Sequence, residues 1–285
     1  MKLQYFGTAA AEGIPAIFCD CPVCQEARKK KGRYIRTRSQ AMIDDKLLVD
    51  FNADTYMHSL KYGVNLSKLE HLFVTHVHED HYYPTELLNR RKGYSPIVAT
   101  PLLTVHGSED LPLYAEREWD ATNAIWRLLQ QDNRVIFDVL RPYERKEIDG
   151  YFVTALPAQH GTPHPYIYIF EKDGKTLLYR NDSGYLTEEI FTYLREKGIK
   201  FDLVSYECTW CDEDAQEAAK YHHLGLPNAI VERQKFIENG NYKDTTISVI
   251  THFSHNMKGA GYGNMKKVAK KNGFVLAYDG MKIEF

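Results

Sequence analysis

The chain has 285 residues, of which 44% are hydrophobic and 26% charged, so its composition is globular and excludes a disordered or fibrous protein. Lys and Arg together number 36 and Asp and Glu 38, which gives a net charge of -2. Proteins built mainly to grip nucleic acid are usually basic, so the charge gives that class of function little support.

No stretch of the chain approaches the roughly 18 consecutive apolar residues that a membrane helix needs. The first seven residues lack the charged and apolar regions of a secretory signal peptide. We therefore expect a cytoplasmic protein with no membrane partner. The sequence shows no repeat, low-complexity segment or Gly/Ser/Pro-rich linker, so residues 1–285 are expected to form a single domain.

Short runs rich in Val, Ile, Tyr and Phe, bounded by turn residues, predict strands. In chain order these runs are residues 3–6, 41–43, 47–50, 72–75, 97–100, 135–137, 152–157, 166–170, 176–179, 203–207, 247–251 and 275–278. Helical patterns cover residues 84–91, 114–131, 187–197, 227–237 and 265–271. An Asp-Gly pair at positions 173 and 174 predicts a hairpin turn. Strands and helices spread from end to end favour two sheets covered by helices, an α/β sandwich.

The clearest functional signal is a group of potential metal ligands directly after the strand predicted at residues 72–75. These ligands are His76, His78, Asp80 and His81. In an extended chain, residues two apart point to the same side, and a loop leaving the strand can fold the later two ligands back beside the first two. Imidazole and carboxylate groups bind zinc, manganese and iron. The loop is therefore expected to supply two ligands to each of two adjacent metal ions.

This H-x-H-x-D-H pattern after an apolar strand resembles the motif of the metallo-β-lactamase superfamily. The resemblance implies a four-layer αββα sandwich with a dinuclear metal site at one edge of the two sheets. It also implies three later ligands in the order His, Asp, His, each at the end of a strand. Residues of these types follow predicted strands in that order, namely His160, Asp182 and His252.

The resemblance also implies how the ligands are divided. Those of one metal are His76, His78 and His160. Those of the other are Asp80, His81 and His252, with Asp182 bridging the two ions. The ions are expected to be manganese or zinc, with iron as a third option, because this ligand set accepts all three. A hydroxide that bridges the metals is the expected nucleophile of a hydrolysis reaction.

A second group of potential ligands is the C-x-C-x-x-C pattern of Cys19, Cys21 and Cys24. Three thiols this close in a cytosolic chain are more typical of a metal site than of disulfides. A closed structural zinc site takes four ligands, so the fourth must come from elsewhere in the fold. His255 is the candidate, because it follows His252 by three residues and is free to face a neighbouring site. The alternative is three reduced or redox-active thiols without a metal.

The cysteines narrow the resemblance to one branch of the superfamily. Residues 7–16, the C-x-C-x-x-C pattern, the basic run at 36–39 and the Thr-His-x-Ser-His run at 251–255 resemble the phosphoribosyl cyclic phosphodiesterases of the PhnP family. That resemblance implies a structural zinc on the three cysteines and His255. It also implies manganese or a similar ion at the dinuclear catalytic site.

Hydrolysis of a phosphodiester leaves an alkoxide oxygen that needs a proton, and a positioned general acid contributes roughly 10²–10⁴-fold to such a step. His223 is the candidate, because it precedes a predicted helix, where the PhnP family also has a histidine. His222 is the adjacent alternative. Together with Asp80, which is also a metal ligand, His223 makes up the predicted catalytic pair.

The predicted function is metal-dependent hydrolysis of a small, cyclic phosphodiester such as phosphoribosyl cyclic phosphate. The alternatives are a tRNase Z-like nuclease and a non-catalytic or cofactor-biosynthesis member of the superfamily. All seven catalytic ligand positions are filled, which disfavours the non-catalytic interpretation. The net charge of -2 disfavours a nucleic-acid substrate without excluding it. The sequence is also compatible with a homodimer.

Three further features remain open at the level of sequence. Cys208 and Cys211 form a C-x-x-C pair, for which structural or incidental thiols are favoured over a redox or metal site. Residues 101–143 are expected to be an insertion that covers the active site. Asp50 is expected either to orient a ligand histidine or to serve as a turn residue.

Overall fold

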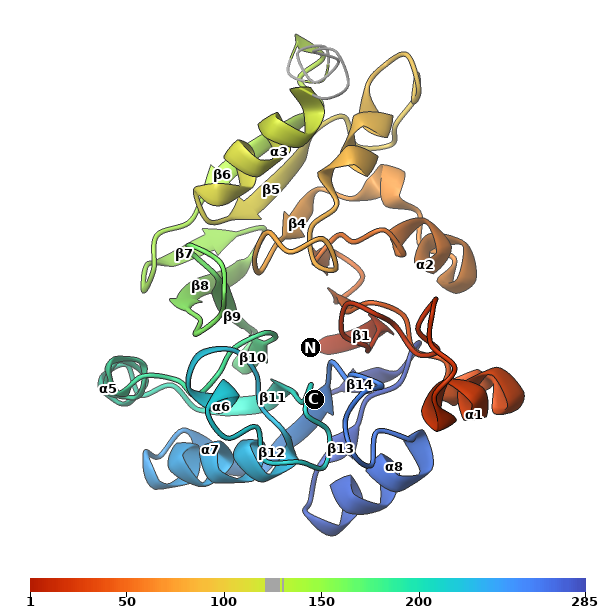
Figure 1. Ribbon diagram of the computed structural model, residues 1–285. Coiled ribbons are helices and arrows are strands. Elements are labelled where there is room, and N and C mark those ends of the chain that lie inside the picture. The colour runs from red at the N-terminus through yellow and green to blue at the C-terminus, as the bar shows by residue number, and fades with distance from the viewer. Residues whose placement is uncertain (121–128, 130) are drawn as a thin grey trace.

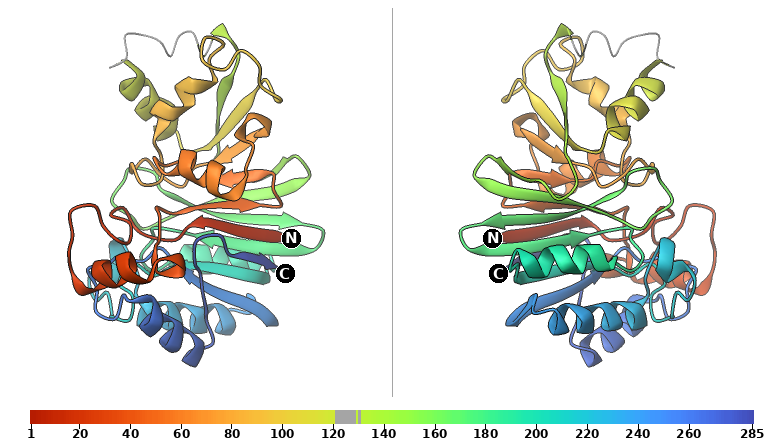
Figure 2. Two further views of the ribbon diagram at one scale, coloured as in Figure 1. Left: turned by 90° about the vertical axis from the view of Figure 1, so that its right-hand side faces the viewer. Right: turned by 90° about the vertical axis from the view of Figure 1, so that its left-hand side faces the viewer.

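Two sheets lie face to face in the computed structural model, which describes residues 1–120, 129 and 131–285 (Figures 1 and 2). The first has seven strands in the order β14 (Lys282–Glu284), β1 (Lys2–Gly7), β2 (Gln40–Ile43), β3 (Leu47–Val49), β4 (His71–Phe73), β5 (Leu103–Gly107) and β6 (Val135–Val139). The second also has seven, in the order β13 (Val275–Leu276), β12 (Tyr242–Thr251), β11 (Phe201–Glu207), β10 (Lys175–Arg180), β9 (Tyr166–Lys172), β8 (Tyr151–Pro157) and β7 (Arg145–Ile148).

Helices lie outside both sheets, so the layers run helix, sheet, sheet, helix (Figure 2). Beside the first sheet lie α2 (Thr55–Tyr62) and α3 (Asp110–Asp120), and beside the second lie α5 (Glu188–Glu196), α7 (Leu226–Glu238) and α8 (Tyr262–Lys271) (Figure 1). The other helical segments are α1 (Pro22–Lys30), α6 (Ala218–Tyr221), η1 (Gly32–Tyr34), η2 (Leu66–Lys68) and η3 (Pro84–Arg90). The predicted αββα sandwich is confirmed. No helix in the described part of the chain is long and apolar enough to cross a lipid bilayer.

Alternation along the strands builds this layering, because successive side chains of a strand point to opposite faces. In β3, Leu47 belongs to the apolar cluster between the two sheets, whereas Leu48 belongs to the cluster under the helices of the first sheet. In β10, Leu177 packs between the sheets and Leu178 packs under the helices of the second sheet. Both faces of each sheet are therefore buried, which explains the continuous apolar runs in the sequence.

Strand direction sets where the functional residues can gather. In the second sheet β8 and β10 both run antiparallel to β9, and β10, β11 and β12 are parallel to one another. The carboxyl ends of β8, β10, β11 and β12 therefore share one edge. In the first sheet β3, β4, β5 and β6 are likewise parallel.

Most predicted strands are confirmed, and the errors have physical causes. The prediction of a strand at residues 97–100 is wrong, because Pro96 and Pro101 bracket an irregular loop in which Ile97 is exposed. The strand of that region is β5. The strands β7 and β14 were not predicted, because both are edge strands rich in charged residues and give no apolar run. Asp173 and Gly174 both have positive φ and form the predicted hairpin turn between β9 and β10.

The helix predictions are less accurate at their ends. Residues 84–91 form the 3₁₀ segment η3 and not an α-helix. The helix predicted at 114–131 begins earlier, as α3, and its residues 121–128 and 130 lie outside the described residues. Within the segment 101–143, the strands β5 and β6 belong to the first sheet. The expectation that this segment covers the active site stays a prediction. The short helices α1, α2 and α6 were not predicted.

Candidate metal centre

The predicted ligands meet where strands of the two sheets end. β4 leads into residues 74–81, β8 leads into His160, β10 into Asp182 and β12 into His252. Because β8, β10 and β12 run in the same direction, the last three residues share one edge of the second sheet. The loop after β4 crosses from the first sheet, and the rings of His81 and His252 lie 5.2 Å apart between centroids.

The first half of the centre consists of three imidazoles and a carboxylate. Nδ1 of His78 lies 3.0 Å from Nε2 of His76 and 3.0 Å from Nε2 of His160. Oδ2 of Asp182 lies 3.6 Å from each of these two Nε2 atoms. Four potential ligand atoms thus point into one small space, and they belong to the residues that the family resemblance assigns to the first metal, with Asp182 as the bridge.

The second half consists of two imidazoles and two carboxylates. Oδ1 of Asp182 lies 2.9 Å from Nε2 of His252, and its Oδ2 lies 3.3 Å from Nε2 of His81. Oδ2 of Asp80 lies 3.3 Å from the same nitrogen of His81. Asp182 belongs to both halves, so it occupies the position that a bridging ligand requires.

The electrostatics of the two halves differ. Burial lowers the pKa of His76 well below its usual value and lowers that of His160 to about 4, so both are neutral imidazoles with lone pairs free to bind a cation. Burial also opposes charge on His81, but the carboxylates of Asp182, Asp50 and Asp80 outweigh it and raise the pKa of His81 well above its usual value. The second half therefore has a surplus of negative charge that favours a cation.

Two buried groups fix the ring orientations of the second half. Oδ2 of Asp50 lies 2.7 Å from Nδ1 of His81, and Oγ1 of Thr209 lies 2.9 Å from Nδ1 of His252. In each ring the other nitrogen, Nε2, faces the centre. Such contacts hold a ligand imidazole in one tautomer and one orientation. The expectation that Asp50 orients a histidine is thus borne out by its contacts, whereas Thr209 was not recognised in the sequence.

Left-handed backbone aims three of these side chains. Asp50 has a φ of 66°, Asp182 of 46° and His252 of 61°. Residues with a Cβ rarely adopt this conformation, and each instance costs roughly 1–2 kcal/mol. Each of the three comes just after a strand, so the chain turns sharply there and directs the side chain into the edge of the sandwich.

His223 lies beside the first half of the centre. Its ring centroid is 4.9 Å from that of His160 and 6.0 Å from that of His252. The adjacent His222 contributes its backbone oxygen, which lies 3.2 Å from Nδ1 of His160. The ring of His222 lies farther away, 6.2 Å from that of His160, and does not line the cavity, so of the two candidates for the proton donor His223 has its ring nearer the centre.

A buried carboxylate that the sequence analysis missed supports His223. Oε2 of Glu207, the last residue of β11, lies 3.7 Å from Nδ1 of His223. The hydroxyl of Thr209 donates to the same Oε2 and lies 3.2 Å from that Nδ1. Burial opposes charge on His223, but Glu207 outweighs it and raises the pKa of His223. The place of Glu207 at the carboxyl end of a strand parallel to β10 and β12 was the available signal.

The cysteine cluster assembles as predicted, near the centre but separate from it. Potential ligand atoms of Cys19, Cys21, Cys24 and His255 all lie within 4.8 Å of one another. One contact joins the two distant segments, with Sγ of Cys21 3.6 Å from Nδ1 of His255. Burial opposes ionisation of Cys21, but the backbone N–H of Cys24 and the His255 side chain outweigh it and lower the pKa of Cys21 to about 6. Cys21 directly precedes α1, whose N-terminus favours a thiolate.

Cys208 and Cys211 take a different role. Both are fully buried, and their thiols donate to backbone oxygens, of Cys211 and Ser254 respectively. Burial raises the pKa of Cys211 to about 12. Neither residue belongs to a cluster of potential ligands among the described residues. These thiols are therefore structural, as favoured from the sequence.

A cavity of about 200 Å³ opens directly on the centre. Its lining includes His78, Asp80, His160, Asp182 and His252 from both halves, together with His223. Residues 10–12 and Thr209 complete the wall. A reacting group in this cavity would contact potential ligands of both metals and the His223 ring at once.

The residues present fit a pair of divalent cations. Nδ1 of His78 lies 3.0 Å from two other imidazole nitrogens, but one ring nitrogen has either a single proton or a single lone pair, so it forms a good hydrogen bond with only one of them. A mixed set of imidazole nitrogens and carboxylate oxygens suits zinc, manganese or iron. The Cys₃His set suits a closed tetrahedral zinc site.

Comparison with known sequences agrees with this geometry. A family model described as a Beta-lactamase superfamily domain matches residues 48–238. Ribonuclease Z from Listeria innocua serovar 6a is 26% identical over 176 residues, which are 61% of this chain and 50% of that protein. The chain thus spans about half the length of the curated relatives it matches.

Solved structures cover the whole chain. A diphosphatase of the PhnP family is similar with a TM-score of 0.73 and 20% identity, over 100% of this chain and 97% of that one. The zinc-bound PqqB from Methylobacterium extorquens is similar with a TM-score of 0.76 and 17% identity, over 100% of both chains. At these identities the likeness shows the fold.

Proposed function

Because the chain belongs to the metallo-β-lactamase superfamily and gathers the side chains of a metal-dependent hydrolase, we propose that it hydrolyses a small cyclic phosphodiester, such as phosphoribosyl cyclic phosphate. The observation that carries the proposal is the convergence of both metal-ligand clusters and His223 on one cavity of about 200 Å³. Typical ligand pockets measure about 300–1,000 Å³, so this one suits a compact phosphate group better than an extended polymer.

In this proposal the first metal is held by His76, His78 and His160. The second is held by Asp80, His81 and His252, with Asp182 shared between them. When bound, such a pair of ions supplies an activated water and a Lewis acid that withdraws charge from phosphate oxygens. Manganese and zinc are the ions we expect there, and zinc is the ion we expect on the four residues of the cysteine cluster.

The chain's own residues then position the substrate and handle a proton. Protonated His223 faces the cavity and donates its proton to the leaving oxygen of the diester. Glu207 stabilises that protonated ring. Asp50 and Thr209 keep two ligand histidines aimed at the centre throughout the reaction. The general acid is what an alkoxide leaving group requires, which is why we favour a phosphodiester.

A nuclease that acts on a larger RNA is the second candidate, and the similarity to Listeria ribonuclease Z favours it. That similarity covers 61% of this chain, and the net charge of -2 gives little general attraction to a polyanion. The two functions differ in salt dependence. Binding of RNA weakens steeply as salt rises, whereas KM for a small diester changes little.

The test uses purified protein loaded separately with Mn²⁺ and Zn²⁺. The substrates are a bis-aryl phosphodiester, a ribose cyclic phosphate, a 2′,3′-cyclic nucleotide and a precursor tRNA, each at low and high salt. We expect turnover of the cyclic diesters with a KM that is insensitive to salt. Cleavage of the tRNA alone, with strong salt dependence, would favour the nuclease. No turnover of any phosphodiester with either metal would refute the proposed function.

A further inference from the structure

A second cavity, of about 510 Å³, lies beside the metal centre and shares one wall with it. The shared residue is His78, which lines both this cavity and the smaller one at the centre. A molecule whose phosphate reaches the metal ligands can therefore extend past His78 into the larger space. The volume falls within the roughly 300–1,000 Å³ that is usual for small-molecule sites.

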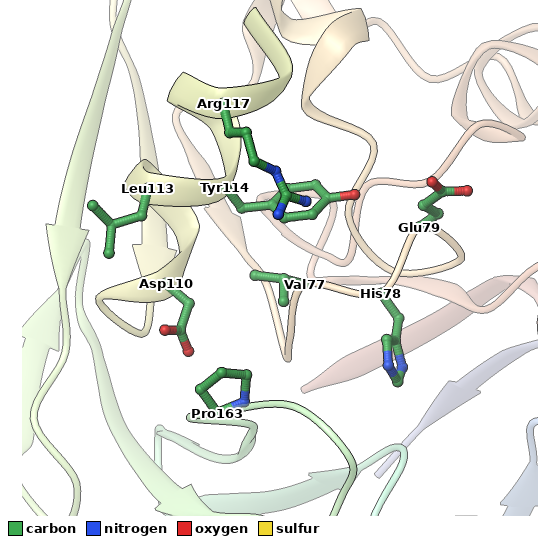
Figure 3. A pocket seen from close by; sticks show the side chains of 8 residues that line it. All are labelled: Val77, His78, Glu79, Asp110, Leu113, Tyr114, Arg117 and Pro163. Carbon is green, nitrogen blue, oxygen red and sulfur yellow. The ribbon is translucent and has the colours of Figure 1, made fainter.

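The walls of this side cavity are mainly apolar and aromatic. Figure 3 shows Arg117 and Tyr114, both from α3, on one side and Pro163 on the opposite side, with Val77 lying between that pair and Pro163. The side chain of Leu113, also on α3, borders the same space. The guanidinium of Arg117 lies 4.8 Å from the centroid of the Tyr114 ring. Flat guanidinium and phenol groups of this kind are surfaces on which aromatic rings stack.

The side cavity is also held in shape. Both carboxylate oxygens of Asp110, the first residue of α3, accept hydrogen bonds from His164, with its backbone N 3.0 Å from Oδ2. This contact fastens the loop that carries Pro163 to α3. The ring of Tyr114 packs 6.0 Å from that of Tyr82, which is fully buried. Two of the walls therefore have fixed positions before any ligand binds.

Charge argues against a second phosphate as the occupant. Arg117 is the one cation of the lining, and Glu79 and Asp110 are two anions. A site for an additional phosphate needs a surplus of positive charge, which these residues do not provide. A neutral, planar group is the better match, because it uses the apolar walls and the stacking surface without needing a counter-charge.

We propose that the side cavity binds a planar aromatic ring carried by the phosphodiester, such as a nucleobase or an aryl ester group. This inference rests on the proposed function for its phosphate half. It makes Tyr114 and Arg117 determinants of specificity, which act by stacking on the ring next to His78. A ring-bearing ligand then binds more tightly than the corresponding sugar phosphate.

The test measures binding as well as turnover, with the metal-loaded protein. Calorimetry compares adenosine 5′-monophosphate, phenyl phosphate and ribose 5-phosphate. We expect both ring-bearing ligands, or the nucleotide alone if the site prefers a base, to bind on the order of 10-fold more tightly than ribose 5-phosphate. Tyr114→Leu and Arg117→Ala should each remove most of that preference. Glu116→Ala, an exposed change on the same helix outside the cavity, serves as the control and should retain it.

Equal affinity for all three ligands in the wild type would overturn the inference. So would a ring preference that survives both substitutions, and Arg117→Ala keeps this test valid if Tyr114→Leu fails to fold, since Arg117 is exposed. Ring-dependent binding without hydrolysis of any phosphodiester would leave the inference standing and refute the proposed function instead. The same preference should appear in kcat/KM for a 2′,3′-cyclic nucleotide against a ribose cyclic phosphate.

Discussion

Oδ2 of Asp50 lies 2.7 Å from Nδ1 of His81, and both side chains are completely buried. Oδ1 of the same carboxylate accepts hydrogen bonds from the backbone N and the hydroxyl of Thr75, each at 2.9 Å. Asp50, the residue directly after β3, therefore holds both ends of the loop that carries four potential ligands. The position of this loop depends on a carboxylate that faces away from the proposed metals.

Replacing that carboxylate should weaken metal binding without removing a ligand. For Asp50→Asn we expect the affinity of the second metal to fall about 10–100-fold, because His81 loses the group that fixes its ring. Metal titration followed by mass spectrometric counting of bound ions measures this. Asp45→Asn, an exposed change in the turn before β3, is the control. Equal affinities in the two variants would mean that Asp50 has only a turn role.

Substitution of His223 should impair catalysis while leaving the metals in place. For His223→Gln we expect kcat to fall roughly 10²–10⁴-fold, because the leaving oxygen loses its proton donor. The matched control is His222→Gln, since the His222 ring lies 6.2 Å from that of His160 and does not line the cavity at the centre, whereas the His223 ring does. On a substrate with a good leaving group, such as a nitrophenolate, kcat of His223→Gln should fall much less, because that group needs no proton donor. Similar losses on both substrates would contradict the assignment.

Removal of one thiol from the cysteine cluster should cost one metal ion and part of the stability. For Cys21→Ser we expect one equivalent of zinc fewer per chain and a Tm lower by at least about 5 °C, because the metal ties two segments far apart in the sequence. Zinc analysis and thermal unfolding monitored by circular dichroism measure the two effects. Cys208→Ser should keep the full zinc content, because Cys208 lies in no ligand cluster of the described residues.

A buried ion pair behind the centre should contribute strongly to stability. Nε of Arg180 lies 3.2 Å from Oε2 of Glu232, and both side chains are fully buried. For Glu232→Gln we expect a loss of about 3–5 kcal/mol in the free energy of unfolding, because the Arg180 charge stays buried without its partner. Glu188→Gln breaks the exposed pair with Lys235 and should cost at most about 1 kcal/mol. Urea unfolding measures both, and equal losses would contradict the prediction.

Acid sensitivity should depend in part on His58. This side chain of α2 is buried against the Gln40 amide and the Thr37 hydroxyl, and the charges of Asp54 and Lys61 act on it in opposite directions. Burial lowers its pKa to about 4, whereas the unfolded chain binds a proton near pH 6.5. The unfolded state therefore takes up more protons between these values, and stability should fall as the pH drops from about 6.5 towards 4.

The measurement for His58 is chemical denaturation at pH 7 and pH 5. The wild type should lose more stability between these values than His58→Gln, by up to about 2 kcal/mol. Leu60→Gln, an exposed change on the same helix, provides the control and should keep the wild-type pH dependence. An identical loss in all three proteins would show that His58 is already protonated in the folded state.

The fold was predictable where buried strands produce an apolar pattern in the sequence. Strands buried on both faces carry adjacent apolar residues, such as Leu177 and Leu178 in β10, whereas the edge strands β7 and β14 are rich in charged residues and resemble loops. The short helix α1 begins at Pro22, within the cysteine pattern, and its nine residues are too few for a clear helical period.

The residues of the candidate site were also predictable only in part. His76, His78, Asp80 and His81 lie within six residues, so their spacing alone indicates a metal site. Glu207 and Thr209 give no such signal, because a single polar residue at a strand end is ordinary until parallel strands place it beside others. Their roles depend on which strands are neighbours, and that information lies in the pairing of β10, β11 and β12.

The left-handed backbone at Asp50, Asp182 and His252 has a consequence for how this protein can be engineered. Glycine would relieve the backbone at each position, but it would remove the potential ligands Asp182 and His252 and the Asp50 carboxylate that orients His81. Screens that select only for thermal stability should therefore drift towards loss of activity at these sites. A screen that supplies metal and selects for bound metal should instead retain these residues. Metal binding stabilises the folded protein and so offsets the conformational cost of the left-handed backbone.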